Sequence, residues 1–338
     1  MAKIADWDDH IGRRLRLRDL RVFFAVVRSG SLSKAAAQLR VSHPAVSQVI
    51  ADLEHALGAR LFDRSSRGVE PTIYARALLV RGRAAFDELK QGIRDIEHLT
   101  DPTAGELTVG YVQSNANTIF PQIVERFSAD HPRVLMRADI VPAPSFTFPG
   151  LRDRTYDLIL ARISKPLPDN DAVNDLDIEV LFDDPWIIAA SMHTPWARRR
   201  KIDLAELMEE PWLMPPPDTP SYEIVAEALK ARGVRMPTAT LVTYSIDLRA
   251  KLSARGRFIT IIPRSVLGDA DEPRRVLKEL PVKLPVRPWL VAVLTLKNRT
   301  LSPIVQRFTA CAREFARPFA NASGSERPAA HRTDDPRR

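Results

Sequence analysis

The stretch KAAAQLRVSHPAVSQVIADLE, residues 34–54, reads as the end of one helix, a short polar break and a second helix. Ala35 and Ala36 have small side chains that still favour a helix, so another helix can cross the first one closely. The break is Arg40-Val41-Ser42, and its serine can cap the second helix. Two helices joined at a steep angle by a turn of three or four residues form a helix-turn-helix.

Apolar side chains recur on both sides of this break. We expect Leu39, Val41, Val46 and Val49 to hold the second helix against the first. An ordinary helical hairpin with an alanine-rich contact is the alternative interpretation. The length of the break, the valine spacing and the local excess of basic residues together favour the helix-turn-helix.

Polar side chains cluster at the beginning of the second helix, and we expect them to face outward. A recognition helix reads base edges in the major groove of double-stranded DNA from this end, and a glutamine can form two hydrogen bonds with adenine. Ser31 or Ser33 can cap the first helix. Backbone N–H groups near Ser33 and Ser42, together with nearby arginines, would contact phosphates. The predicted DNA-binding residues are Ser33, Ser42, His43, Pro44, Ser47, Gln48, Arg64 and Arg67.

The segment RLFDRSSRGVEPT, residues 60–72, predicts two short strands joined by a Ser-Ser-Arg-Gly turn. Arg64 and Arg67 flank the tip of this hairpin, which would form a small wing beside the helices. Arginines on such a wing contact phosphates or the minor groove. A basic hairpin that is only solvated is the alternative.

The charge distribution supports an anionic partner for the N-terminal part of the chain. The 338 residues have a net charge of +8, and residues 11–76 contain twelve Arg or Lys against five acids. Cys311 is the single cysteine, so neither an intrachain disulfide nor a cysteine-based metal cluster can form, which suits a reducing cytoplasm. The N-terminus has no apolar signal segment, and no window approaches the ~18 apolar residues of a membrane span. We therefore expect a cytoplasmic protein with no membrane partner.

A long helix is predicted to follow the hairpin, over residues 72–99. It has one apolar stripe, with charged residues opposite. Turn-forming residues at 100–106, TDPTAGE, predict a hinge. Residues 1–16 lack periodicity and predict a flexible arm, whereas residues 318–338 are polar and proline-rich and predict a disordered tail. The apolar stripe of the predicted helix at 72–99 consists of Leu78, Ala85, Leu89, Ile93 and Ile96.

Beyond residue 106 strands alternate with helices. This alternation favours α/β units with parallel sheets, so the chain as a whole is predicted to be α+β. The segment at 178–191, IEVLFDDPWIIAAS, fits either two strands or one bent strand. The predicted strands cover residues 106–112, 133–141, 156–163, 238–242, 258–262 and 289–296, and the predicted helices cover 118–127, 222–231, 247–254 and 303–315.

These features resemble the LysR-type transcriptional regulators. The N-terminal part has the motifs F-x-A-V, S-x-x-x-A-A-x-x-L-x-V-S-x-P-A-V-S, I-x-x-L-E-x-x-L-G-x-x-L-F-x-R and R-G-V-x-x-T in the family's order and spacing. Further on, GELTVGYV, YDLILARI and ARGRFITIIP also match, although less specifically. The similarity covers the chain from about Leu17 to Phe315.

The resemblance implies three parts. A winged helix-turn-helix at 17–75 is expected to bind DNA, and the long helix is expected to pair with another subunit through its apolar stripe. A two-lobed domain like the periplasmic binding proteins would bind a small effector at 107–317. Lobe I would cover about 107–180 and 283–317, and lobe II about 181–282. Expected partners are double-stranded DNA, the effector and further copies of the chain in a homodimer or homotetramer, with RNA polymerase as a further candidate.

The effector cleft is predicted at the carboxyl ends of the strands, where ligands bind in open α/β sheets. The segment GYVQSNANT leads from a strand into a helix, whose N-terminus could hold a carboxylate. Each of the candidates could instead be a helix cap or a solvated residue, and the arginine could form a surface ion pair. The candidates are Ser114, Asn115, Asn117, Ser145, Thr147, Arg162 and Ser245.

Three other classes of protein fit less well. The chain lacks G-x-S-x-G, H-E-x-x-H, G-x-x-x-x-G-K-[ST] and G-x-G-x-x-G motifs, and its seven histidines lack metal-ligand spacing, so we expect neither an enzyme nor a cofactor or metal site. A transport-type solute binder would need an export signal, and it would have no use for the basic N-terminal region. An architectural DNA binder without effector control remains the third alternative.

Overall fold

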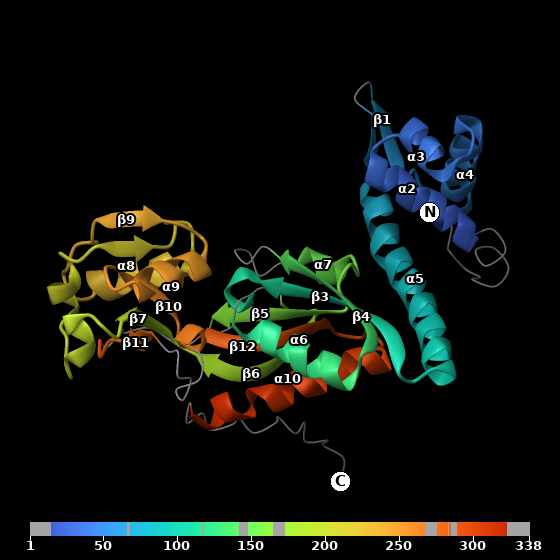
Figure 1. Ribbon diagram of the computed structural model, residues 1–338. Helices are drawn as coiled ribbons and strands as arrows, with labels where there is room; N and C mark the ends of the chain where they lie inside the picture. Colours follow the sequence, from blue (N-terminus) through green and yellow to red (C-terminus); the bar gives the residue numbers. More distant parts are fainter. Residues whose placement is uncertain are drawn as a thin grey trace, which may run out of the picture. The chain divides into compact units, whose positions relative to one another are not determined.

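The computed structural model describes residues 15–65, 68–116, 118–141, 148–164, 173–267, 276–282, 284 and 289–322 (Figure 1). The chain divides into two compact units, Met1–Lys90 and Gln91–Arg338. Over this described part, no helix is both long enough and apolar enough to cross a membrane.

Over its described residues, the N-terminal unit has three helices, a hairpin and the first part of a long helix. Ser31 caps the second helix by accepting a hydrogen bond from the Lys34 N–H, and Ser42 caps the third by accepting one from the Ala45 N–H. Arg40 ends the second helix in a left-handed conformation with φ of 56°. The predicted break of three residues is therefore confirmed. The elements are α2 (Leu17–Ser29), α3 (Leu32–Leu39), α4 (His43–Leu57), β1 (Phe62–Ser65), β2 (Gly68–Pro71) and α5 (Ile73–Thr100).

Small side chains lie where the helices of this unit meet. Ala35 and Ala36 are buried in one cluster with Phe23, Val46 and Ile50, as the alanine pattern predicts. The expectation for Val41 is wrong, since 47% of its surface is exposed. It follows the left-handed residue that ends α3, and this turn directs the chain away from the cluster before α4 begins.

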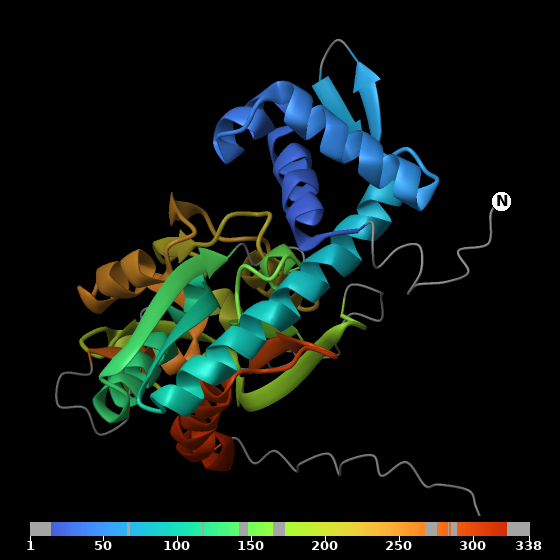
Figure 2. The same cartoon turned by 90° about the vertical axis from the view of Figure 1, so that its right-hand side faces the viewer.

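The hairpin is fixed against the helices by backbone contacts. Strands β1 and β2 pair antiparallel (Figure 2). Gly68 has φ of 128°, and a Cβ there would lie 2.7 Å from the Gly30 carbonyl oxygen, so this position requires glycine. The Val69 N–H donates to that same oxygen at 3.0 Å. Glu54 Oε1 on α4 accepts from the Leu61 N–H at 2.7 Å. The wing is thus held to both ends of the helix-turn-helix.

The C-terminal unit contains two five-stranded sheets, which we call lobe I and lobe II (Figure 1). Lobe I has the strand order β4-β3-β5-β12-β6, and lobe II has the order β11-β7-β10-β8-β9. Lobe I comprises β3 (Ala104–Val112), η2 (Gln113–Asn115), α6 (Ile119–Asp130), β4 (Arg133–Val141), α7 (Pro149–Arg152), β5 (Leu158–Ser164), β6 (Leu176–Asp184), β12 (Trp289–Leu296) and α10 (Pro303–Ala322). Lobe II comprises β7 (Trp186–Ser191), η3 (Pro195–Arg198), η4 (Leu204–Leu207), β8 (Trp212–Met214), α8 (Pro220–Lys230), β9 (Ala239–Val242), α9 (Ile246–Ala254), β10 (Ile259–Pro263), η5 (Arg264–Leu267) and β11 (Leu277–Glu279).

Both sheets are mixed, so the expectation of parallel sheets is wrong in part. Strand β3 pairs parallel with β4 and β5, but β12 pairs antiparallel with both β5 and β6. In lobe II, β10 pairs parallel with β8 and antiparallel with β7. The antiparallel pairs arise where the chain passes from one lobe to the other and later returns. A pattern of alternating elements does not reveal these crossings.

Three expected boundaries differ from the structure. Strand β3 begins at Ala104, inside the predicted hinge at 100–106. Strand β6 stays in lobe I as far as Asp184, because its whole length pairs with β12, so the chain enters lobe II after residue 184 and not after 180. Helix α10 continues to Ala322, past the expected start of the tail at 318. Phe319 explains this extension, since its ring stacks on Phe182 with the centroids 4.8 Å apart.

Candidate DNA-binding and effector-binding sites

The N-terminal end of α4 presents a polar surface. The predicted side chains Ser33, Ser42, His43, Pro44 and Gln48 are exposed, and Ser47 is half-buried. They are held on a firm support, because Val46 and Ile50 anchor the opposite side of α4 in the core. A short, capped helix with exposed polar residues in its first turns can enter a DNA groove.

Gln48 is already oriented. Its Nε2 atom donates a hydrogen bond to Asp52 Oδ1, one helical turn further on, at 2.8 Å. A glutamine amide has two N–H donors and one carbonyl acceptor, and within the described part of the chain one donor and the acceptor stay available for a second partner. Adenine requires that combination in the major groove.

The wing arginines are only partly described by the structure. Arg64 lies on β1, where its backbone pairs with Val69. Arg67 lies outside the described residues.

A small cavity of about 110 Å³ lies between lobe I and lobe II. Polar residues from the segment joining β3 to α6 form one wall. The opposite wall comes from the first turns of α9 and from η5. The lining residues are Gln113, Ser114, Thr118, Ile246, Asp247, Ala250 and Val266. This position, beyond the carboxyl end of a strand, is where open α/β sheets bind ligands.

Ser114 lines the cavity, and its hydroxyl has a defined role. The oxygen accepts a hydrogen bond from Arg162 Nε at 3.2 Å. Among the residues that the structure describes, no acceptor takes the hydroxyl proton. The hydroxyl can therefore donate to a ligand in the cavity.

Arg162 is buried behind this wall and does not line the cavity. Its Nη1 atom lies 2.6 Å from Asp184 Oδ2, and each of these two side chains is 2% exposed. Its Nη2 atom donates to Asn115 Oδ1 at 3.3 Å and, across the lobes, to Ser265 Oγ at 3.4 Å. The surface ion pair considered from the sequence is thus a buried one, and Arg162 holds the Ser114 oxygen from behind the cavity wall.

The other predicted effector residues divide into two groups. Asn115 is fully buried, and its Nδ2 atom donates to the Leu160 carbonyl at 3.1 Å, so it supports β5 and does not line the cavity. Ser245 accepts from the Leu248 N–H at 3.1 Å and is the cap of α9. These two residues are better explained by structural roles. Asn117, Ser145 and Thr147 lie outside the described residues.

Helix α6 begins beside the cavity without a side-chain cap. Thr118 occupies the cap position, but its hydroxyl donates to the Ser114 carbonyl at 3.2 Å and accepts no N–H of the helix. The first N–H groups of a helix carry a partial positive charge. The lobe I wall therefore combines hydrogen-bond donors with a positive potential.

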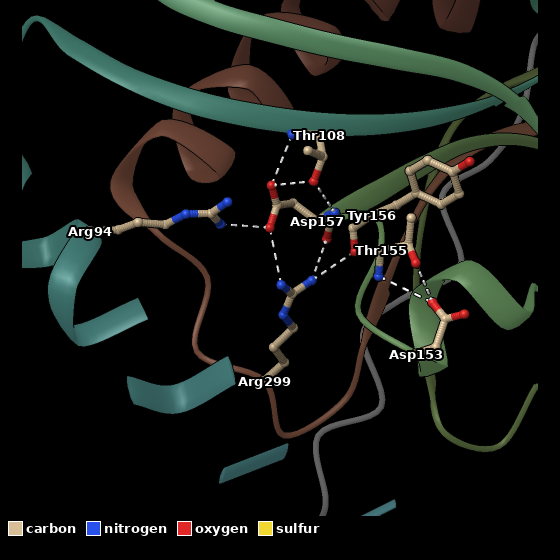
Figure 3. A network of polar contacts seen from close by, with 7 residues as sticks. All are labelled: Arg94, Thr108, Asp153, Thr155, Tyr156, Asp157 and Arg299. Atoms are coloured by element: carbon tan, nitrogen blue, oxygen red, sulfur yellow. Dashed lines mark hydrogen bonds and ion pairs between the residues drawn. The ribbon is translucent and has the colours of Figure 1, made fainter. Parts of the chain in front are cut away.

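Asp157 is the centre of a polar network that the sequence patterns did not single out (Figure 3). One oxygen accepts from the N–H and the hydroxyl of Thr108, at 2.9 and 2.8 Å. The other oxygen accepts from Arg94 on α5 at 2.8 Å and from Arg299 at 3.0 Å. Burial alone would raise the pKa of the Asp157 carboxyl, but the charge of Arg94 and the bonds from Thr108 outweigh burial and hold the pKa below its ordinary value. The sequence shows only an aspartate before an apolar strand, and the structure was needed to identify the partners of Asp157.

The apolar stripe of α5 is partly covered. Leu78 packs against the core of the N-terminal unit, so it does not belong to a free face. Ala85 is exposed, and Leu89, Ile93 and Ile96 are 49%, 58% and 65% exposed. Three large apolar side chains exposed along one helix face are typical of a surface that a partner covers.

Two family models match this chain. Residues 17–76 match the model described as "Bacterial regulatory helix-turn-helix protein, lysR family". Residues 100–317 match the LysR substrate binding domain.

Known relatives match over most of their length. The chain is 26% identical over 302 residues to the HTH-type transcriptional regulator GbpR of Azospirillum brasilense, covering 88% of this chain and 85% of GbpR. It is 26% identical over 296 residues to the transcriptional dual regulator GltC of Bacillus subtilis, covering 87% and 95%. A full-length OxyR variant from Pseudomonas aeruginosa has a similar fold, with a TM-score of 0.62, 21% identity and coverage of 93% and 99%. CbnR, described as a LysR family transcriptional regulator, gives a TM-score of 0.55 at 20% identity, with coverage of 89% and 99%.

Proposed function

Since the chain belongs to the LysR family of bacterial helix-turn-helix regulators, we propose that a small, carboxylate-bearing effector in the cavity between its lobes alters its contacts with DNA. Membership makes the protein a DNA-binding transcriptional regulator with an effector-binding domain, and not an enzyme. The chemistry of the effector, the residues of both sites and the mode of assembly belong to the proposal.

The proposal of a carboxylate rests on a single observation, the hydrogen bonding of the Ser114 hydroxyl. Arg162 Nε donates to the Ser114 oxygen and no described acceptor takes the hydroxyl proton, so the hydroxyl of this cavity-lining residue can donate to a ligand. The uncapped N-terminus of α6 adds a partial positive charge to the same wall. A carboxylate accepts several hydrogen bonds and carries a negative charge, so it matches both features.

DNA contacts are proposed for the exposed beginning of α4 and for the wing. Gln48 and His43 would read base edges, and the backbone at Ser33 and Ser42 would meet phosphates together with Arg64 and Arg67. Support comes from the exposure of these α4 and α3 side chains and from the second N–H donor and the carbonyl acceptor of Gln48, which take no partner among the described residues.

We propose that the protein acts as a homodimer or homotetramer. The exposed Leu89, Ile93 and Ile96 on α5 supply an apolar face for the subunit contact. Palindromic DNA sites bind two-fold symmetric proteins, so pairing would also place two recognition helices on one duplex. A cytoplasmic location follows from this role in a bacterial cell, and RNA polymerase is the expected further partner.

The test compares Ser114→Ala with Ser128→Ala, an exposed serine on the same lobe whose hydroxyl donates only to the Glu125 carbonyl among the described residues. Footprints on DNA upstream of the neighbouring operon would be measured with and without a panel of small carboxylates. We expect one carboxylate to change the footprint and to raise the melting temperature of the wild type and Ser128→Ala, but not of Ser114→Ala. DNA protection that no carboxylate changes would contradict the effector part and favour an architectural DNA binder.

A further inference from the structure

The cavity between the lobes has a wall of opposite character on its lobe II side. Asp247 lies in the first turn of α9 and is the one charged side chain among the described lining residues. Its side chain is 32% exposed, so it is partly screened from water. A carboxylate in this position attracts a cation or a strong hydrogen-bond donor.

Asp247 is only weakly neutralised by the protein. Its ion-pair partner is Lys251, with Nζ at 2.8 Å from Oδ2, but that side chain is 74% exposed and is held by an i,i+4 contact on the helix surface. Such a pair contributes little, because water screens it and the lysine is flexible. Arg162 lies behind the other wall, and its charge is compensated by Asp184. The cavity thus has hydrogen-bond donors on the lobe I side and a negative charge on the lobe II side.

We propose that the effector is a small amino acid, or another small zwitterion, whose carboxylate meets Ser114 and whose ammonium group meets Asp247. This inference rests on the proposed carboxylate site and names the second group that the ligand must carry. The rest of the lobe II wall is Ile246, Ala250 and Val266. The cavity volume of about 110 Å³ leaves room for a short apolar side chain of the ligand beside these residues.

A ligand with charges at both ends would connect the two lobes. Its carboxylate would bond to the segment after β3, and its ammonium group would bond to α9. A ligand that lacks either charge would engage only one wall. Because a ligand shifts a conformational equilibrium only by its differential affinity, contacts to both lobes are the means by which a small molecule can favour one arrangement of the lobes.

Asp247 also has a simpler role, which the test must separate from ligand binding. An acid in the first turn stabilises any helix through the helix dipole. Glu223 has this role in α8 of the same lobe, is exposed, and is not among the lining residues of the cavity. Glu223→Gln is therefore the matched control for Asp247→Asn, since both changes remove a first-turn charge and only one alters the cavity.

The experiment measures dissociation constants by titration calorimetry on the full-length protein. The probes are the twenty standard amino acids and β-alanine, each compared with the acid that lacks the amino group, such as propionate for alanine. We expect at least one amino acid to bind about tenfold or more tightly than its matched acid. Asp247→Asn should weaken this amino acid about tenfold and leave the matched acid nearly unchanged, whereas Glu223→Gln should change neither.

The outcomes distinguish the two proposals. If matched acids bind as tightly as the amino acids, or if Asp247→Asn binds the amino acid like the wild type, the zwitterion is wrong and the carboxylate site stands. If only acids without an amino group bind, the zwitterion is likewise wrong and the carboxylate site stands. If no amino acid and no carboxylate binds, both proposals are wrong. If Glu223→Gln also loses amino-acid binding, the weaker binding of Asp247→Asn reflects the stability of lobe II, and the proposed contact of Asp247 with the ammonium group is wrong.

Discussion

Arg94 Nη1 lies 2.8 Å from Asp157 Oδ1, so the last third of α5 is joined to the residue that precedes β5 (Figure 3). The same carboxylate also bonds to Arg299 at 3.0 Å. Two guanidinium groups therefore share one buried acid, and only Arg94 comes from the long helix. The arrangement attaches α5 to lobe I through a contact that can be removed without leaving Asp157 unpaired.

The first prediction compares the two ends of this contact. Arg94→Ala should cost about 1.5–3 kcal/mol, the value of a hydrogen bond to a charged group, because Arg299 still neutralises Asp157. Asp157→Asn should cost about 3–5 kcal/mol, because it leaves buried arginine charge without its counter-ion. Tryptophan fluorescence during denaturant unfolding would measure both, since Trp186, Trp196, Trp212 and Trp289 lie in the C-terminal unit. Equal losses would contradict the asymmetry.

The second prediction concerns pH. The pKa of Asp157 lies below its ordinary value of 3.8, because the charge of Arg94 and the bonds from Thr108 together exceed the effect of burial. A carboxyl with a lowered pKa stabilises the folded state fully above its unfolded pKa, and the contribution is lost as the pH falls through the folded pKa. The free energy of unfolding of the wild type should therefore fall towards that of Asp157→Asn as the pH drops below about 4. A difference between the two proteins that stays constant over that acid range would disprove it.

The third prediction tests the helix crossing. Ala35 is fully buried at the meeting of α2, α3 and α4, so Ala35→Leu should overpack the core and destabilise the N-terminal unit by about 1–3 kcal/mol. Ala37 lies on the same helix and is exposed, so Ala37→Leu should change stability by less than about 0.5 kcal/mol. Thermal unfolding followed by circular dichroism compares them. If Ala35→Leu is as stable as the wild type, the close crossing does not depend on alanine.

The fourth prediction concerns base recognition by Gln48. Gln48→Ala should lower the affinity for the specific site by about 1–3 kcal/mol and leave binding to random DNA nearly unchanged. Fluorescence anisotropy on both duplexes, at fixed salt, measures this ratio. Gln306→Ala, at an exposed position on α10, is the control. Equal losses on both duplexes would show that Gln48 reads no base.

The fifth prediction concerns the exposed face of α5. Leu89→Asp places a charge in the proposed subunit contact and should shift the protein towards the monomer in sedimentation velocity. Val80 is also exposed on α5 and lies nine residues away, which places it on the opposite side of the helix. Val80→Asp should therefore sediment like the wild type. A Leu89→Asp protein of parental mass would place the subunit contact elsewhere.

Local patterns predicted the helix-turn-helix closely. The serine caps and the break after Leu39 depend on neighbours within a few residues, and the buried alanines pack within the N-terminal unit, so short-range patterns contain most of the interaction. Val41 is the exception, because the apolar spacing does not show that Arg40 adopts the left-handed conformation, after which Val41 is exposed. For the effector candidates, the sequence did not show which side chains would line a cavity. Ser114 lines the cavity, whereas Asn115 and Arg162 are buried against structural partners and Ser245 caps α9.

By itself, the sequence determined the DNA-binding unit and the family, because helix periodicity, caps and turn residues act over short distances along the chain. Only the tertiary structure decided which polar groups meet. Asp157 gathers Arg94, Thr108 and Arg299, and the cavity brings Ser114 opposite Asp247. These partners are separated by tens to hundreds of residues, and no local pattern records the antiparallel return of β12 or the second lobe that brings them together.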